Sequence, residues 1–174
     1  MSKADERSLL EALLDSWDRN NTILVNLLRA VPEGGLEARA VEDSKTSGSM
    51  SVAEMFLHIH GSRQFVLSED APEFALEPLQ KGWRETRDRD RIAEMLNESA
   101  RAVRAAVKNG VETGKEMLVR YDHPILLLQH MVWHEGYHHG QIKLALKAMG
   151  KPLDDEEIGR VTWHLWFDKA EAGR

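Results

Sequence analysis

Apolar residues recur every three or four positions along four long segments of the chain, a spacing typical of amphipathic α-helices. The segments are residues 5–30, 51–68, 87–109 and 124–150. A shorter helix is predicted to begin near residue 154 or 155 and to contain Trp163, Trp166 and Phe167, whose large side chains suggest a core or subunit contact. The pattern predicts an all-α protein: a four-helix bundle with a short additional C-terminal helix, in one domain over residues 1–174.

Residues that cap or break helices mark the ends of these segments. Ser51 predicts a capping box at the start of the second helix, Pro124 suits the first turn of the fourth, and Gly110 is expected to end the third. Two polar stretches that contain glycine, proline or small residues are expected to be irregular: residues 36–50 and 69–85. In the second stretch, Phe74 and Trp83 are the expected anchors against the core.

The composition narrows the class of protein. Hydrophobic residues make up 42% of the 174 residues and charged residues 30%, as in ordinary soluble domains. The net charge of -6 leaves no basic surplus to neutralise phosphates, so binding to nucleic acid or to an anionic membrane is not expected. The absence of cysteine excludes disulfides, iron–sulfur clusters and a cysteine nucleophile. A charged N-terminal segment and the lack of an apolar run of about 20 residues predict a cytoplasmic protein.

Two histidines face the apolar side of the predicted fourth helix. His134 and His138 stand four residues apart, so their side chains lie one above the other, in the same arc of a helical wheel as Gln141. His130 lies at the edge of that arc, and His139 lies roughly 100° from its centre. Imidazole rings in an apolar seam cost free energy unless each finds a partner. A shared divalent metal is one such partner, and hydrogen bonds to carboxylates or water from neighbouring helices are the alternative.

A metal site needs at least a third ligand, and the predicted second helix offers two histidines. His58 and His60 are two positions apart, so they point to different faces, and only one of them is expected to reach the site. The helical wheel does not decide between them. His60 lies nearer the stripe formed by Val52, Phe56 and Ile59, whereas His58 shares a side with Met55, Ser62 and Phe65.

Both histidine-bearing segments resemble the DinB superfamily, the DinB/YfiT-like metal-dependent hydrolases. The pattern of that family in the fourth helix is roughly H-x3-H-E-x-x-H-R-G-Q, and residues 130–141 of this chain read HMVWHEGYHHGQ. The pattern in the second helix, T/S-V-x-E/Q-x-x-x-H, matches residues 51–58. Order, separation and helix count agree along nearly the whole chain.

The resemblance implies a four-helix bundle that is usually a dimer. It also implies that His58, His134 and His138 are the metal ligands, and so favours His58 over His60. In one place the chain departs from the family pattern, because His139 stands where the family usually has arginine. An anion contact or salt bridge made by that arginine is therefore not expected here, although the ligands themselves are unaffected.

Three neutral histidines would leave the full charge on a divalent ion, with zinc or nickel as the best-suited metals, and at least one open position. Such an ion can lower the pKa of a bound water to near ~7 or bind a thiol. The resemblance therefore implies a metal-dependent hydrolase or a transferase that uses a low-molecular-weight thiol. Glu135, as general base or orienting carboxylate, and Gln141, as a hydrogen-bonding group, are the candidate catalytic residues.

Three other interpretations remain. The first is a zinc protease, because residues 134–138 satisfy H-E-x-x-H; its third ligand would then be His164. The second is a non-catalytic, stress-related protein that binds a metal or ligand. The third is a structural bundle in which the histidines only pack. The all-helical pattern and the residues that flank the motif fit the DinB resemblance better than they fit a protease.

Overall fold

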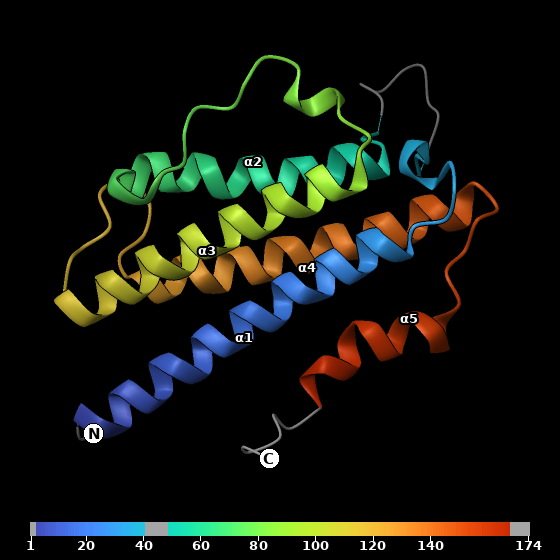
Figure 1. The fold of residues 1–174 in the computed structure, drawn as a ribbon. Helices are drawn as coiled ribbons and strands as arrows, with labels where there is room; N and C mark the ends of the chain where they lie inside the picture. The colour runs from blue at the N-terminus through green and yellow to red at the C-terminus, as the bar shows by residue number, and fades with distance from the viewer. Residues whose placement is uncertain (1–2, 41–48, 168–174) are drawn as a thin grey trace.

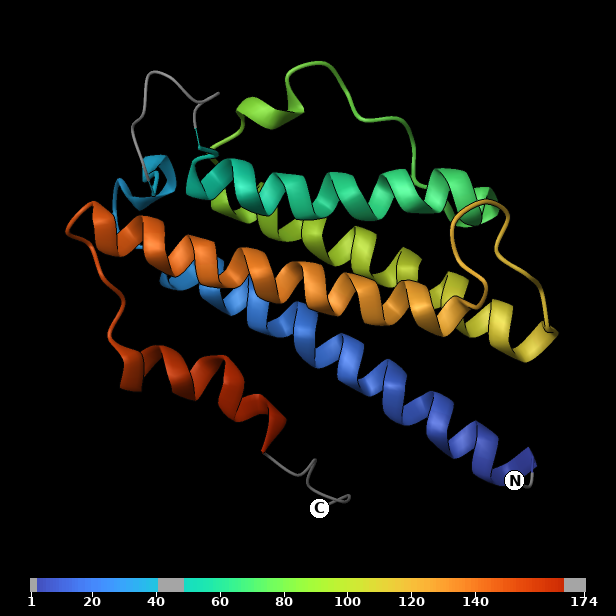
Figure 2. The same ribbon diagram turned by 180° about the vertical axis from the view of Figure 1, so that it is seen from behind.

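The computed structural model describes residues 3–40 and 49–167, and within these residues all regular structure is helical. The α-helices are α1 (Lys3–Ala30), α2 (Val52–Asp70), α3 (Arg89–Thr113), α4 (Pro124–Ala148) and α5 (Asp155–Val161). Short 3-10 turns are formed by Gly35–Glu37, Pro72–Phe74, Trp83–Glu85 and Trp163–Trp166. The four long helices lie side by side as a bundle, and α5 lies along the outside next to α1 (Figures 1 and 2). The predicted four-helix bundle with a short additional C-terminal helix is confirmed.

The caps that the sequence predicted are formed. At the start of α2, the Ser51 hydroxyl accepts from the backbone N–H of Glu54 at 3.3 Å, and the Glu54 carboxylate accepts from the backbone N–H of Ser51 at 2.7 Å. Pro124 lies in the first turn of α4, behind an N-cap in which His123 Nδ1 accepts from the N–H of Ile125. These caps fix where the two histidine-bearing helices begin, and hence the height of each histidine in the bundle.

The prediction that Gly110 ends the third helix is wrong. α3 continues to Thr113, and Gly114, with a φ of 69°, is its C-cap. Gly110 lies inside the helix because the chain before α4 passes close to it: a Cβ at this position would lie 2.6 Å from Pro124 Cγ. The glycine therefore serves close packing and does not break the helix.

The C-terminal segment also differs from the prediction. α5 ends at Val161, Thr162 has a non-helical backbone (φ -121°, ψ -100°), and a separate 3-10 turn follows. The aromatic residues expected in the final helix thus lie in and after that turn, and Trp163, Trp166 and Phe167 are exposed and not part of the core. Of the predicted irregular stretches, residues 69 and 70 belong instead to the end of α2, and the other described residues hold only short 3-10 turns. Phe74 and Trp83 pack against the core as expected. Residues 41–48 lie outside the described part.

A layer of polar residues divides the core of the bundle in two. One apolar cluster joins the second half of α1 to the first halves of α2 and α3 and the end of α4; the other joins the opposite ends of the same helices. Between them, each long helix contributes buried polar side chains. These are Asn20 and Asn21 from α1, His60, Arg63 and Gln64 from α2, Ser99 from α3, and Glu135 and His138 from α4. Four helices place polar groups at the same level, which is where a functional site is expected in a bundle.

Candidate metal centre

Three histidines from two helices converge at one side of the polar layer. His58 Nε2 in α2 lies 3.2 Å from His134 Nε2 in α4, and His138 Nε2, one turn further along α4, also lies 3.2 Å from His134 Nε2. All three rings offer a nitrogen within 4.8 Å of the others, so the group could hold a metal ion. Zn–N bonds of about 2.0–2.1 Å in a tetrahedral site place ligand nitrogens roughly 3.3 Å apart, close to the observed separations.

The surroundings keep these imidazoles neutral. Burial lowers the pKa of His134 to about 4, with a further contribution from its neighbours His138 and His58. Burial also lowers the pKa of His58, helped by the charge of Arg84, and the pKa of His138, helped by His58. Neutral imidazole is the form that binds a metal.

The hydrogen bonding of the rings fits an ion at their centre. His134 Nε2 faces the Nε2 atoms of both other rings, and neutral rings cannot satisfy both contacts well by donating to one another. A cation shared by the three Nε2 atoms would satisfy all of them and place the ring protons on Nδ1. Among the described residues, Nδ1 of His134 and of His138 has no hydrogen-bond partner.

The two other candidate residues of the motif have different surroundings. Gln141 lies next to His138 and partly opposes the fall in the pKa of that histidine, while its amide nitrogen donates to the Tyr137 hydroxyl. Glu135 points away from the three rings. Its carboxylate receives two hydrogen bonds from Arg63, of 2.6 and 2.8 Å, and one from Asn20. This placement argues against Glu135 as a general base or as the acceptor that orients a ligand, and assigns it to the packing of the bundle.

Residues 1–157, which contain all four long helices and the three histidines, match the DinB family. The chain belongs to the DinB family. It has no match among curated proteins or among solved structures.

The remaining histidines of this DinB-family protein lie outside the cluster. His60 is 2% exposed, and its Nδ1 is 2.8 Å from the carbonyl oxygen of Met95 in α3. His130 is hydrogen-bonded to the Tyr121 hydroxyl at 2.8 Å. His139 lines a separate groove beside α5. His164 stacks on Trp163, so the third ligand that a zinc protease would need is not in place.

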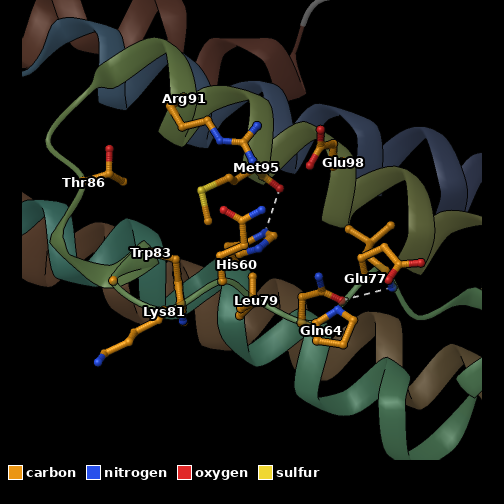
Figure 3. Close-up of a pocket in the computed structure, with 14 residues that line it drawn as sticks. His60, Gln64, Glu77, Leu79, Lys81, Trp83, Thr86, Arg91, Met95 and Glu98 are labelled. Carbon is orange, nitrogen blue, oxygen red and sulfur yellow. Dashed lines mark hydrogen bonds between the residues drawn. The ribbon is translucent and has the colours of Figure 1, made fainter.

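Two cavities flank α2 of this DinB-family protein. One, of about 440 Å³, opens onto the cluster and is lined by His58 and His134 together with Ser62, Phe65, Tyr121 and Arg120. The other, of about 500 Å³, lies on the side of α2 that carries His60, where Gln64, Trp83 and Met95 surround that ring (Figure 3). The i, i+2 spacing of His58 and His60 therefore serves two different faces, as the sequence predicted.

Sequence reasoning missed three arginines near the centre. Arg63 is the buried partner of Glu135, and its place on the buried face of α2, between Ile59 and Val66, was an available signal. Arg84 and Arg120 line the cavity that opens onto the histidines. Both come from connecting segments, where periodicity carries no information about which residues meet in space.

No helix in the described part of the chain is long and apolar enough to cross a membrane.

Proposed function

We propose that this DinB-family protein binds one divalent metal ion through Nε2 of His58, His134 and His138, and acts on a small molecule as a metal-dependent hydrolase or as a thiol-cofactor-dependent transferase. The observation that carries the proposal is the convergence of three neutral imidazole nitrogens beside an open cavity. Zinc or nickel suits such a ligand set. When bound, the ion would act as a Lewis acid toward water or a thiol.

The protein's own groups around the cavity support chemistry at this position. The Ser62 hydroxyl lies 3.4 Å from His58 Nε2, and the Tyr121–His130 hydrogen bond closes another side of the same cavity. Burial raises the pKa of Tyr121, so its hydroxyl stays protonated at neutral pH and can donate to a bound substrate. Gln141 is held beside His138 and retains a buried Oε1 without a hydrogen-bond partner among the described residues, which supports a role in orienting that ring.

The test is elemental analysis of untagged protein, wild type beside His58→Ala and His134→Ala, with His130→Ala as the matched control from the same cavity. We expect about one zinc, nickel or similar ion per chain in wild type and in the control, and its loss in both ligand variants. Far-ultraviolet circular dichroism should show that all four proteins remain helical. Absence of metal from wild type after incubation with excess ion and desalting would refute the proposal.

A second experiment separates an enzyme from a non-catalytic binding protein. Metal-loaded wild type is assayed with panels of ester, amide and thiol-transfer substrates, with the His134→Ala variant as the blank. Turnover that depends on His134 supports the enzyme. A full complement of metal without turnover in any panel supports the alternative, a non-catalytic metal- or ligand-binding protein.

We also propose that the protein forms a homodimer through the outer face of α4. Large side chains that share one stripe of this helix are exposed: Leu126, Trp133, Tyr137 and Leu144. A Cβ added at Gly136 or Gly140 would meet nothing within 4 Å, so another helix could approach the backbone closely there. An exposed apolar stripe of this kind is typical of a protein–protein interface.

We also propose that the protein is a single domain, is located in the cytoplasm and has no nucleic-acid partner. The net charge of -6 supports the last of these three proposals.

A further inference from the structure

The cavity that opens onto the three histidines has the opposite charge from the protein as a whole. The chain carries a net charge of -6, yet the charged residues among the described ones that line this cavity are Arg84 and Arg120, with no aspartate or glutamate. A cavity wall with two guanidinium groups and no carboxylate favours an anionic ligand, because the charge of the ligand is attracted there.

The two arginines differ in how they are held. The Arg120 guanidinium lies 4.7 Å from the centre of the Phe65 ring, and its Nη2 forms an ion pair of 3.5 Å with the Glu69 carboxylate, longer than a normal hydrogen bond. The Arg84 guanidinium stacks on the Trp83 ring at 5.1 Å and forms no ion pair or hydrogen bond with the described residues. Arg84 therefore has donors available for a ligand, and its charge already acts on His58.

The backbone holds Arg84 over the cavity through its neighbour. Trp83 lies against α2 on the His60 side (Figure 3), and a Cβ at Gly61 would lie 2.8 Å from Trp83 Cη2. Gly82, with a φ of 83°, provides the turn that places the indole there. Trp83 is fixed on one side of α2, and the next residue, Arg84, lies on the other side. There Arg84 lines both the cavity that opens onto the three histidines and a smaller pocket beside His58.

We propose that the substrate is a small organic anion, whose carboxylate is held by Arg84 and Arg120 while its reacting group faces His58, His134 and His138. Arginine suits this task because its planar fork can form two parallel hydrogen bonds with one carboxylate. The inference rests on the proposed function, since it assumes that chemistry takes place at the three histidines. Arg84 and Arg120 act in it as specificity-determining residues.

The test compares two probes of the same length and the same thiol that differ in charge: 3-mercaptopropionate and its neutral amide, 3-mercaptopropanamide. Their binding to zinc-loaded protein is measured by titration calorimetry, for wild type, Arg84→Gln, Arg84→Lys and Arg120→Gln. Arg91→Gln is the matched control, because Arg91 lines the other cavity and pairs with Glu94. Zinc content is measured for every sample, and it should be equal in all of them.

The expected result is that wild type prefers the acid, and that Arg84→Gln lowers the ratio of the two affinities by about tenfold, as for the loss of one charge-assisted hydrogen bond. Arg84→Lys should keep part of the preference and Arg91→Gln all of it. The metal itself also attracts an anion, but this contribution is the same in all variants, so it cancels when their affinity ratios are compared. A ratio unchanged in both Arg84→Gln and Arg120→Gln, or no binding of the acid at millimolar concentration, overturns the inference while the metal site stands. A wild type that holds no zinc overturns the proposed function instead.

Discussion

The buried pair between Arg63 in α2 and Glu135 in α4 gives the most informative perturbation of this bundle. Both side chains are 0% exposed, and two hydrogen bonds of 2.6 and 2.8 Å join them. Arg63 Nη1 also donates to Asn21 in α1 and to the carbonyl of Leu96 in α3, while its guanidinium lies 4.7 Å from the Trp17 ring centre. One arginine of α2 thus contacts the three other long helices at the level of the histidines.

Removing one partner of such a pair leaves a buried charge without compensation. For Glu135→Ala we expect the free energy of unfolding to fall by about 3–5 kcal/mol, because the Arg63 guanidinium would stay desolvated without its carboxylate. Glu135→Gln keeps one hydrogen-bond acceptor and loses the charge, so a smaller loss of about 2 kcal/mol is expected. For a domain with a total stability of roughly 5–15 kcal/mol, the alanine variant loses a large share.

The assay is urea denaturation of metal-free protein at pH 7, followed by circular dichroism. Glu94→Gln is the matched control, because Glu94 forms an exposed pair with Arg91 and should cost less than ~1 kcal/mol. Folded Glu135→Gln should still bind metal with wild-type stoichiometry, because its carboxylate does not contact the three histidines.

Two results would refute this reasoning. If the free energy of unfolding of Glu135→Ala lies within about 1 kcal/mol of the wild-type value, a difference well below the expected range, the pair does not stabilise the packing of the helices. If Glu135→Gln keeps its stability and its metal but loses a measured turnover, Glu135 acts as a catalytic base and its structural assignment is wrong.

Three further predictions follow from single contacts. Burial lowers the pKa of His60 from 6.5 to about 4, so the unfolded state takes up a proton first. The contribution of His60 to stability is complete above pH 6.5 and falls by about 3 kcal/mol toward pH 4. In urea unfolding of metal-free protein, His60→Phe, but not the control His130→Phe, should reduce the total loss over this pH range by about that amount, while His134 and the other histidines with lowered pKa contribute the rest. Gly110→Ala should lower the free energy of unfolding by about 1–2 kcal/mol, because the clash with Pro124 outweighs the better helix propensity of alanine. A variant that is more stable than wild type in thermal denaturation would show that helix propensity outweighs the clash. Trp133→Glu should turn a dimer into a folded monomer in light scattering at micromolar concentration, and a wild type that is already monomeric would contradict the proposed interface.

The periodicity of apolar residues was sufficient to predict the four long helices, because each of them buries one continuous face. The capping box at Ser51 and the proline at position 124 are local signals, and both were read correctly. Gly110 was misread, since a glycine that ends a helix and one that allows another segment to approach look alike in a sequence; only the contact with Pro124 distinguishes them. At the C-terminus the aromatic spacing suggested one helix, and the non-helical backbone of Thr162 divides it.

The candidate site shows the same division between local and non-local information. The i, i+4 spacing placed His134 and His138 on one inner face because that relation lies within a single helix. Choosing between His58 and His60 required knowing where α2 lies against α3 and α4, which a helical wheel does not contain. The family resemblance favoured His58, and the structure brings His58 to the cluster and turns His60 toward the carbonyl of Met95.

The H-E-x-x-H motif shows how neighbouring helices decide what a short pattern does. Consecutive residues of a helix point about 100° apart, so Glu135 points in a different direction from His134. The glutamate of an H-E-x-x-H motif can act as a base beside the two histidine ligands only if the open cavity reaches both side chains. Here the direction of Glu135 leads into the bundle, where Asn20 from α1 and Arg63 from α2 bind its carboxylate. Arg63 follows His58 by five residues on the same helix, so α2 both completes the histidine cluster and binds the Glu135 carboxylate away from it. The five residues that form a zinc-protease motif in sequence therefore supply two metal-binding candidates and one partner of a structural ion pair in this bundle. In the function proposed above, the groups that would act on a substrate come instead from the connecting segments that carry Arg84, Arg120 and Tyr121.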